Sequence, residues 1–510
     1  MENVYPYLAF LLSLLLLVFH HFLRRKRKLP PSPLALPIIG HLHLIKNQPH
    51  LALQRLASKY GPILFLRLGS LPVVVVSSPS AVQECFTKND IIFANRPRSL
   101  SGDYLTYNYT VVVWASYCDL WRDLRRLTSI ELFSSRSLQK SSIIRKDETR
   151  NLISHLLRIS RTGIRKLELR YWLSLLTFNI ITRLAAGKRC VADGEAGTEE
   201  GKRLLEGLTE VFVPRSPVAL CDFFPILRWV GNKQQEKSMM AMRDKRDELL
   251  QGILDEFREK KAKSSDTGEH NETLIETLVG LQESEPEFYT DDMIKSIILT
   301  MFIAGTETSA TTMERAILLL LDHPEAFQRL RAEIDNQVGH GRLIEESDLA
   351  KLPFLHCVIN ETLRLHPTIP LLLPHYSSEE CTLGGFKVLQ GTTLLVNAWA
   401  LHRDPKVWDE PEKFRPERFE GERPEEFKFI PFGMGRRACP GASMAMRAVS
   451  LVVGALVQCF ELENVGQGEA SQGSGSGVTT LKNEASEVAF FPRRNALELM
   501  SQLQNNMDPR

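Results

Sequence analysis

Residues 427–442 read FKFIPFGMGRRACPGA, and this stretch decides how the rest of the 510-residue chain is interpreted. It is a glycine-rich loop that leads through Cys439 into an apolar segment, residues 442–459, expected to be helical. A cysteine at the start of a helix lies near unpaired backbone amides and the positive end of the helix dipole, which stabilise its thiolate. The stretch therefore predicts a cysteine that serves as a soft metal ligand.

Three interpretations of this stretch are open. A haem bound through Cys439 fits, because the glycines let the backbone approach a flat group and Arg437 neutralises a propionate. The pattern of residues 433–438 also imitates a dinucleotide-binding turn. Against that, Pro440 falls inside the helix such a turn requires, and no alternation of strands and helices surrounds it. An isolated cysteine is otherwise most often a buried structural residue.

A second unusual segment is residues 291–322, which is apolar nearly all round and predicts a central, buried helix. Its middle reads AGTETS, residues 304–309, where Gly305 costs about 1 kcal/mol of helix propensity and Glu307 brings a charge into a core. Hydroxyls such as that of Thr308, bonded back to carbonyls one turn earlier, widen a helix and admit water. The segment predicts a route for protons into an apolar pocket, unless its hydroxyls merely satisfy the backbone.

Three weaker patterns accompany these two. Glu361 and Arg364 stand three apart in a predicted helix over residues 353–365 and are expected to pair. Residues 414–419, FRPERF, form a charged loop bent by proline, and Trp121 lies one turn before Arg125. Taken alone, each of these has an ordinary surface interpretation.

The amino-terminal region predicts a membrane anchor. Residues 4–23 contain no Lys, Arg, Asp or Glu and as a helix would span roughly 30 Å, the thickness of the hydrocarbon core. Residues 24–28, RRKRK, follow it, an order opposite to that of a cleaved signal peptide. The basic cluster keeps the following chain in the cytosol. A solvated charge run or a nuclear signal is the alternative for residues 24–28.

This topology predicts that the glycosylation sequons at Asn108, Asn271 and Asn360 stay unmodified, because the glycosylation machinery is lumenal. The chain divides into an anchor with its basic cluster (residues 1–28), a stiff proline-rich hinge (29–40) and one cytosolic domain (41–510).

Composition supports one large globular domain. With 43% hydrophobic residues and a formal charge of +2, the chain is neither disordered nor a nucleic-acid binder, and its eight scattered cysteines suit a reducing compartment. Residues 63–68 and 73–76 predict a strand pair. Most other segments have helical periodicity, so a mainly α protein is expected. The predicted helices cover residues 80–88, 140–159, 235–261, 291–322, 325–338, 353–365 and 442–459, and polar loops cover 263–272 and 466–477.

In this order, the motifs resemble those of the cytochrome P450 haem-thiolate monooxygenases, over nearly the whole chain. The haem loop matches as Phe432-x-x-Gly435-x-Arg437-x-Cys439-x-Gly441 and the oxygen-activating helix as residues 304–309. Within the family, these stretches and the hinge look like the plant group numbered 81. The resemblance implies a mainly α fold with small β-sheets behind one transmembrane helix.

The resemblance also assigns roles to residues. Haem b would be held by Cys439 as axial iron ligand, with Thr308 ordering protons and Glu307 as its acidic partner. The remaining cofactor-binding residues would be Trp121, Arg125, His375, Phe432, Gly435, Arg437 and Gly441. Glu361, Arg364 and Arg418 would form a buried structural cluster.

Electrons would come from NADPH through the membrane-bound NADPH-cytochrome P450 reductase, with cytochrome b5 as a further partner that the resemblance allows, at the endoplasmic reticulum. Arg436 and Lys428 would favour an acidic partner. The expected substrate is a lipophilic phenolic such as an isoflavonoid, a benzophenone or xanthone, or a lignan, either hydroxylated or oxidatively coupled or ring-closed. Terpenoid or indole hydroxylation, a haem-thiolate isomerase and a non-catalytic haem protein are the alternatives. An isomerase usually lacks the Thr308-type hydroxyl.

By resemblance, substrate contacts would come from residues 100–114, 297–304, 368–374 and 478–481. Two departures from the family pattern stand out. Cys118 occupies a position where relatives usually carry glycine, and residues 471–477 are unusually rich in serine and glycine.

Overall fold

The computed structural model describes residues 28–45, 48–161, 166–213, 219–230, 233–263, 273–421, 425–465, 487–494 and 496. The predicted membrane span (residues 4–23), almost all of the basic cluster and the sequon at Asn271 lie outside the described residues. So do most of the two predicted polar loops, the Ser/Gly-rich run (471–477) and the predicted substrate contacts at 478–481.

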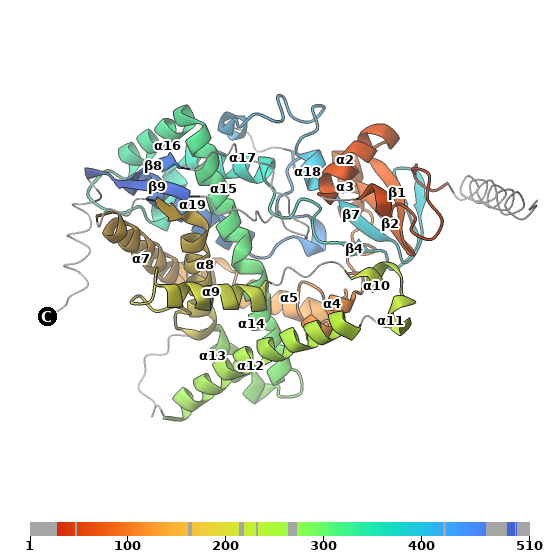
Figure 1. The fold of residues 1–510 in the computed structure, drawn as a ribbon, viewed down its shortest axis with the longest axis horizontal. Coiled ribbons are helices and arrows are strands. Elements are labelled where there is room, and N and C mark those ends of the chain that lie inside the picture. Colours follow the sequence, from red (N-terminus) through yellow and green to blue (C-terminus); the bar gives the residue numbers. More distant parts are fainter. Residues whose placement is uncertain are drawn as a thin grey trace, which may run out of the picture.

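The protein is mainly α, as predicted. Figure 1 shows a large helical part beside a smaller part that contains the main sheet. The α-helices are α2 (Pro49–Tyr60), α3 (Pro79–Phe86), α4 (Leu100–Leu105), α5 (Asp119–Glu131), α6 (Ser135–Lys140), α7 (Ser142–Arg161), α8 (Leu169–Ala186), α9 (Glu199–Phe212), α10 (Leu220–Phe223), α11 (Leu227–Val230), α12 (Lys233–Lys263), α13 (Leu274–Ser284), α14 (Asp291–Gly305), α15 (Glu307–Asp322), α16 (Pro324–Gln337), α17 (Pro353–Leu365), α18 (Ala398–Leu401) and α19 (Ala442–Cys459). Short 3-10 helices are η1 (Leu42–Leu44), η2 (Glu346–Lys351), η3 (Pro416–Phe419) and η4 (Gly435–Arg437).

The central helix predicted over residues 291–322 is two helices. α14 and α15 run through the middle of the helical part, between α12 and α13 at one end and α16 at the other (Figure 1). They meet at Thr306, whose φ of −89° and ψ of −81° are not helical. The Thr306 hydroxyl donates to the Phe302 carbonyl at 2.8 Å and the Thr308 hydroxyl to the Ala304 carbonyl at 2.6 Å. These bonds compete with the backbone ladder next to a glycine, so one continuous helix was the wrong prediction.

Gly305 is required at this break because α8 packs directly against it. A Cβ atom there would lie 2.6 Å from Cδ1 of Ile181. We expect Gly305→Ala to lower the free energy of unfolding by about 1–3 kcal/mol through overpacking. In an Ile181→Val background, which lacks Cδ1, most of that loss should disappear. Urea denaturation of the four variants measures the coupling, and equal losses in both backgrounds would show that the contact is not the cause.

The predicted strand pair is confirmed. In the main sheet, with order β1-β2-β7-β4, β1 pairs antiparallel with β2, which pairs parallel with β7. The strands of this sheet are β1 (Ile63–Leu68), β2 (Leu71–Val76), β4 (His375–Tyr376) and β7 (Thr393–Val396). The smaller sheets are made of β3 (Lys166–Glu168), β9 (Glu487–Pro492) and β8 (Phe460–Asn464), and of β5 (Cys381–Leu383) with β6 (Phe386–Val388).

The predicted hinge, residues 29–40, lies along β1 in the structure. The Phe65 amide donates to the Pro31 carbonyl at 2.9 Å, and Gly40 forms a β-bridge with Leu68. The hinge therefore continues the edge of the main sheet, and its prolines fix a segment that is held by backbone hydrogen bonds.

Helix α19 begins directly after the cysteine-containing stretch, with the predicted bounds. Among the described residues it is the one helix long and apolar enough to cross a membrane, but 67% of it is buried inside the protein. It packs against α7, α15, α16 and α17. It is a core helix, and its packing against these four helices fixes the position of the loop that precedes it.

Candidate haem site

The cysteine loop, residues 427–441, folds back on itself before α19. The Cys439 amide donates to the Phe432 carbonyl at 2.8 Å, and the Ala438 amide donates to the Gly435 carbonyl at 3.0 Å. Gly435 has a φ of 66°, and a Cβ atom there would lie 2.3 Å from Oδ1 of Asp90. Both facts require glycine at this position, so the loop shape depends on the residue that the sequence pattern singled out.

The Cys439 residue is exposed, although protein surrounds it closely enough for burial to raise the pKa of its thiol. Two features lower the pKa of the thiol and so stabilise the thiolate: the Gly441 amide donates a hydrogen bond to the sulfur, and the Arg125 guanidinium lies nearby. A Cβ atom on Gly441 would lie 4.0 Å from the sulfur. A reachable sulfur with a hydrogen-bond donor and a cation beside it suits a thiolate metal ligand.

Arg125, near the sulfur, belongs to a group of cations that also contains Arg96 and Arg437 and that we call the arginine cluster; Arg96 is buried, and Arg125 and Arg437 are half-buried. Burial lowers the pKa of all three, that of Arg96 to about 10 and that of Arg437 to about 9. Repulsion from the other two arginines contributes at Arg437. Within the described residues, the hydrogen bonds that Arg96 and Arg437 make go to backbone carbonyls and none to a carboxylate.

Buried cations without a carboxylate partner are costly, so the arginine cluster calls for an anionic ligand. A haem meets this need, because it brings two carboxylates and an iron atom for the Cys439 sulfur. The residues present therefore fit the predicted haem. Arg96 was missed from the sequence because it lies far from the other motifs and belongs to no helical pattern. Its position became evident only from the fold.

Trp121 and His375 lie beside the arginine cluster and already have hydrogen-bond partners. The Trp121 indole donates to the Val112 carbonyl at 3.2 Å, and the Arg437 guanidinium lies 4.4 Å from its ring centroid. Nδ1 of His375 donates to the Phe93 carbonyl at 2.8 Å. Burial and then Arg96 hold the pKa of His375 well below its usual range. Neutral His375 therefore presents Nε2 as an acceptor, and it would donate to a carboxylate only after gaining a proton.

The structure separates the two members of the predicted proton relay. Thr308 is half-buried, next to an exposed Ala304, whereas Glu307 is buried with 5% of its surface exposed. The Glu307 carboxylate is held on the α8 side by Arg170 and by the Ser174 hydroxyl at 3.1 Å. Adjacent residues of a helix point about 100° apart, so the two side chains serve different faces.

Glu361, Arg364 and Arg418 are brought together in a separate cluster of hydrogen bonds. Glu361 accepts two hydrogen bonds from Arg364, at 2.7 and 2.8 Å, and one from Arg418 at 3.0 Å. Neither Glu361 nor Arg364 has exposed surface. Arg364 also donates to the carbonyls of His402, Pro411 and Lys413. This cluster fastens the meandering segment of residues 402–419 to α17.

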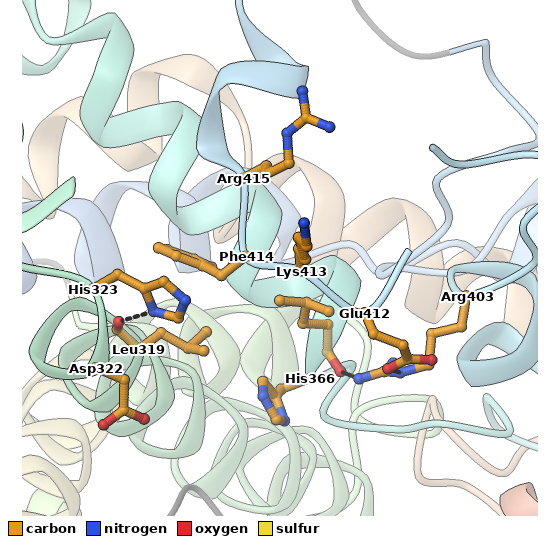
Figure 2. Close-up of a pocket in the computed structure, with 10 residues that line it drawn as sticks. Leu319, Asp322, His323, His366, Arg403, Glu412, Lys413, Phe414 and Arg415 are labelled. Carbon is orange, nitrogen blue, oxygen red and sulfur yellow. Dashed lines mark hydrogen bonds and ion pairs between the residues drawn. The ribbon is translucent and has the colours of Figure 1, made fainter. Parts of the chain in front are cut away.

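A hollow of about 460 Å³ lies behind this cluster, at the C-terminal ends of α15 and α17. Figure 2 shows His323, His366 and Phe414 around it, with Arg403 beside Glu412 and Arg415 pointing away. None of the predicted haem or proton-relay residues lines it. The hollow is therefore distinct from the candidate haem site.

Comparison with known proteins agrees with this geometry. A sequence model of the family described as Cytochrome P450 matches residues 30–486. Cytochrome P450 81Q32 of Catharanthus roseus is 46% identical over 98% of this chain and 98% of its own length. The (+)-piperitol/(+)-sesamin synthase CYP81Q2 of Sesamum radiatum is 45% identical, covering 94% of this chain and 93% of its own. An isoflavone 3'-hydroxylase of Medicago truncatula is 46% identical, covering 89% and 91%.

Proposed function

Because this chain belongs to the cytochrome P450 family, within the plant group numbered 81, and is therefore a haem-dependent monooxygenase, we propose that it oxidises a lipophilic phenolic. Hydroxylation, oxidative coupling or ring closure would be the reaction, with NADPH as the electron source. The observation that supports this substrate class is the activity of similar relatives. The relatives that are named for an activity are isoflavone hydroxylases and a (+)-piperitol/(+)-sesamin synthase, and isoflavones, piperitol and sesamin are all oxygenated aromatic compounds.

The residues around the cysteine loop have distinct tasks in this proposal. Cys439 would hold the iron, and the arginine cluster would bind the two carboxylates. When bound, the haem supplies activation of dioxygen and transfer of one oxygen atom. Phe432 and Gly435 shape the loop, and Gly441 gives the sulfur its hydrogen bond.

Proton delivery is the proposed task of Thr308. Its hydroxyl hydrogen is donated to the Ala304 carbonyl, so its oxygen is left as an acceptor that orients a water molecule. Glu307 would be the acid that supplies the proton, after its carboxylate has left Arg170 and Ser174 and has taken up a proton from water. A relay of this kind depends on hydrogen-bond reach and contributes through general acid catalysis.

We expect Thr308→Ala to uncouple NADPH consumption from product formation. Product per NADPH should fall by about 100-fold, the lower end of what general acid catalysis contributes, while peroxide release rises. Thr311→Ala is the matched control, since it removes a buried hydroxyl of the same helix, which donates to the backbone carbonyl of Glu307. Measuring NADPH, peroxide and product together tests the role. Equal coupling in the two variants would remove Thr308 from the relay.

Arg437 is expected to secure the haem. We expect Arg437→Met to raise the haem dissociation rate by about tenfold to 100-fold, the loss of one charge-assisted hydrogen bond. Arg436→Met is the control, because the Arg436 side chain is 43% exposed and pairs with Asp90 at 2.7 Å. Transfer of haem to an excess of apomyoglobin gives both rates. Equal rates would show that Arg437 does not hold the cofactor.

The cellular setting is proposed from the sequence. Residues 1–28 would anchor the chain in the endoplasmic reticulum membrane, residues 29–40 would be the hinge, and residues 41–510 would be the cytosolic catalytic domain. NADPH-cytochrome P450 reductase would supply electrons, with cytochrome b5 as a second partner. Arg436 and Lys428 are paired with Asp90 and Glu425, so an acidic partner would compete with these carboxylates.

The test is mass analysis of products from microsomes that contain this chain and a plant reductase, supplied with isoflavones, benzophenones, lignans, indoles and diterpenes. One added oxygen on a phenolic supports hydroxylation, and a loss of two hydrogens supports coupling or ring closure. Turnover confined to terpenoids or indoles would overturn the phenolic proposal. Rearrangement of a substrate without NADPH would indicate an isomerase. No turnover of any substrate, together with an intact thiolate-type carbonyl spectrum, would indicate a non-catalytic haem-binding protein.

A further inference from the structure

The loop of residues 106–115 is fastened at its C-terminal end by the candidate haem site. The Val112 carbonyl accepts from Trp121 and Arg437, and the Ala115 carbonyl also accepts from Arg437. The Val113 carbonyl accepts from Arg96 at 3.1 Å. Two members of the arginine cluster therefore hold the loop as well as the expected carboxylates. The C-terminal end of the loop therefore lies against Trp121 and Arg437 of the candidate haem site.

The other end of the loop is held by charged side chains from two long helices. The Tyr107 hydroxyl donates to Oδ1 of Asp247 on α12 at 2.8 Å, and Nζ of Lys295 on α14 donates to the same oxygen at 2.6 Å. Nζ of Lys295 lies 5.5 Å from the Tyr107 ring centroid and 3.1 Å from Asp292. Only 5% of the Lys295 side chain is exposed, and it is the one charged residue of α14 after the two aspartates that begin the helix.

A buried arginine next to this group connects the same elements through the backbone. Arg246 on α12 donates to the Leu105 carbonyl at 2.8 Å and to the Val211 carbonyl of α9 at 2.7 Å. It is 2% exposed, and burial lowers its pKa to about 10. The segment that precedes the loop is therefore fixed independently, and Tyr107 is the residue that attaches the loop to Asp247 of α12.

The loop is not relaxed at this attachment. Tyr107, Asn108 and Tyr109 have φ of 46°, 53° and 62°, the left-handed region that non-glycine residues rarely occupy. Such a run persists only where surrounding contacts hold it. Releasing the contact at Tyr107 removes the contact that holds this run from α12 and α14, while the Tyr109 hydroxyl still bonds Ser99 and Asp103. This strain is the reason to expect a second, relaxed arrangement of the loop, in which the contact at Tyr107 is broken.

We propose that Tyr107, Asp247 and Lys295 form a latch that holds the loop of residues 106–115 closed beside the haem site, and that Tyr107 is the residue that positions this loop for substrate. The latch holds one end of the loop, and the arginine cluster holds the other end. Along α14, Lys295 lies nine residues before Ala304, a distance of about 13 Å. A bulky ligand must displace or contact it. The inference rests on the proposed function only in assuming that haem and substrate bind beside the loop.

The latch is tested with the full haem-loaded chain and the variants Tyr107→Phe and Tyr104→Phe. Both remove a hydroxyl from the same short region, but in the described part of the chain the Tyr104 hydroxyl has no hydrogen bond, whereas Tyr107 bonds Asp247. Amide exchange over residues 100–115, followed by mass spectrometry, should become about tenfold faster in Tyr107→Phe, the loss of one charge-assisted hydrogen bond. It should stay within twofold of the parent in Tyr104→Phe.

Ligand entry distinguishes a latch from a general loss of stability. Binding of clotrimazole, which is bulky, and of imidazole, which is small, is followed by the shift in haem absorbance after rapid mixing. Tyr107→Phe should speed clotrimazole association about tenfold and leave imidazole within twofold. A merely structural role would change both ligands alike. Exchange in Tyr107→Phe equal to that in Tyr104→Phe would overturn the latch.

Lys295→Met and the double variant with Tyr107→Phe keep the test decisive if one variant folds poorly. If the two residues share one latch, amide exchange in the double variant should be no faster than in the faster single variant. If the two contacts are independent, the increases in exchange rate should multiply. If the parent chain gives no thiolate-type carbonyl spectrum, the proposed function fails. The exchange measurement would still test the latch, because it needs no turnover.

Discussion

Replacing Cys439 with serine is expected to abolish oxygenation. The variant loses the sulfur that the Gly441 amide and Arg125 stabilise, and a serine hydroxyl is a poor soft-metal ligand. Turnover should fall to the background of reductase alone, and the carbonyl complex should lose its thiolate-type absorbance. Because the arginine cluster remains, some haem should still bind. Carbon monoxide difference spectra and product assays on purified protein measure both effects.

Cys118→Ser is the matched control for this change. Cys118 is exposed, at the N-cap of α5, close to the same site. Serine is favoured at an N-cap, so this variant should keep its stability, its thiolate spectrum and its turnover. If Cys439→Ser retained the thiolate spectrum, or if Cys118→Ser lost it, Cys439 would not be the iron ligand.

Removing the charge of Arg364 is expected to have the largest effect on stability. Arg364→Met leaves Glu361 buried without its bidentate partner and strands the three carbonyls of residues 402, 411 and 413. Breaking a buried pair from one side costs about 3–5 kcal/mol. That is a large part of the 5–15 kcal/mol that stabilises a typical protein. We expect a chain that folds poorly and retains little haem.

Arg415→Met is the control, because Arg415 belongs to the same segment but its side chain is 43% exposed and pairs with the surface acids Asp409 and Glu410. Exposed pairs contribute about 0–1 kcal/mol, so this variant should be nearly as stable as the parent. Urea unfolding followed by circular dichroism, together with the haem content, compares the two. Similar losses in both would contradict a special role for the buried cluster.

Elements with strong local signals were predicted well from the sequence. Helix α17 begins at Pro353, which suits the first turn, and ends before Pro367, and α19 begins after the glycines that break the preceding loop. The strands β1 and β2 were evident from β-branched runs around a turn. In these places the local preference and the tertiary structure agree.

Features that depend on tertiary contacts were not predictable. Helix α8 is buried on nearly every side, so it has no amphipathic period to detect. The break at Thr306 depends on which hydroxyls bond back to the backbone, and Arg96 joins the arginine cluster only because residues 93–96 lie against β4. Glu307 was expected inside one continuous helix but is the first residue of α15, and its attachment to Arg170 depends on the packing of α8.

The parallel pairing of β2 with β7 joins residues 320 positions apart in the chain, Val73 with Thr393. A ribosome that adds 5–20 residues per second needs roughly 16–64 seconds between the two strands. During that interval the edge of β2 formed by its four consecutive valines has no partner, which is the condition under which strands of neighbouring nascent chains associate. Successful synthesis of this protein therefore depends on how well that edge is shielded during translation.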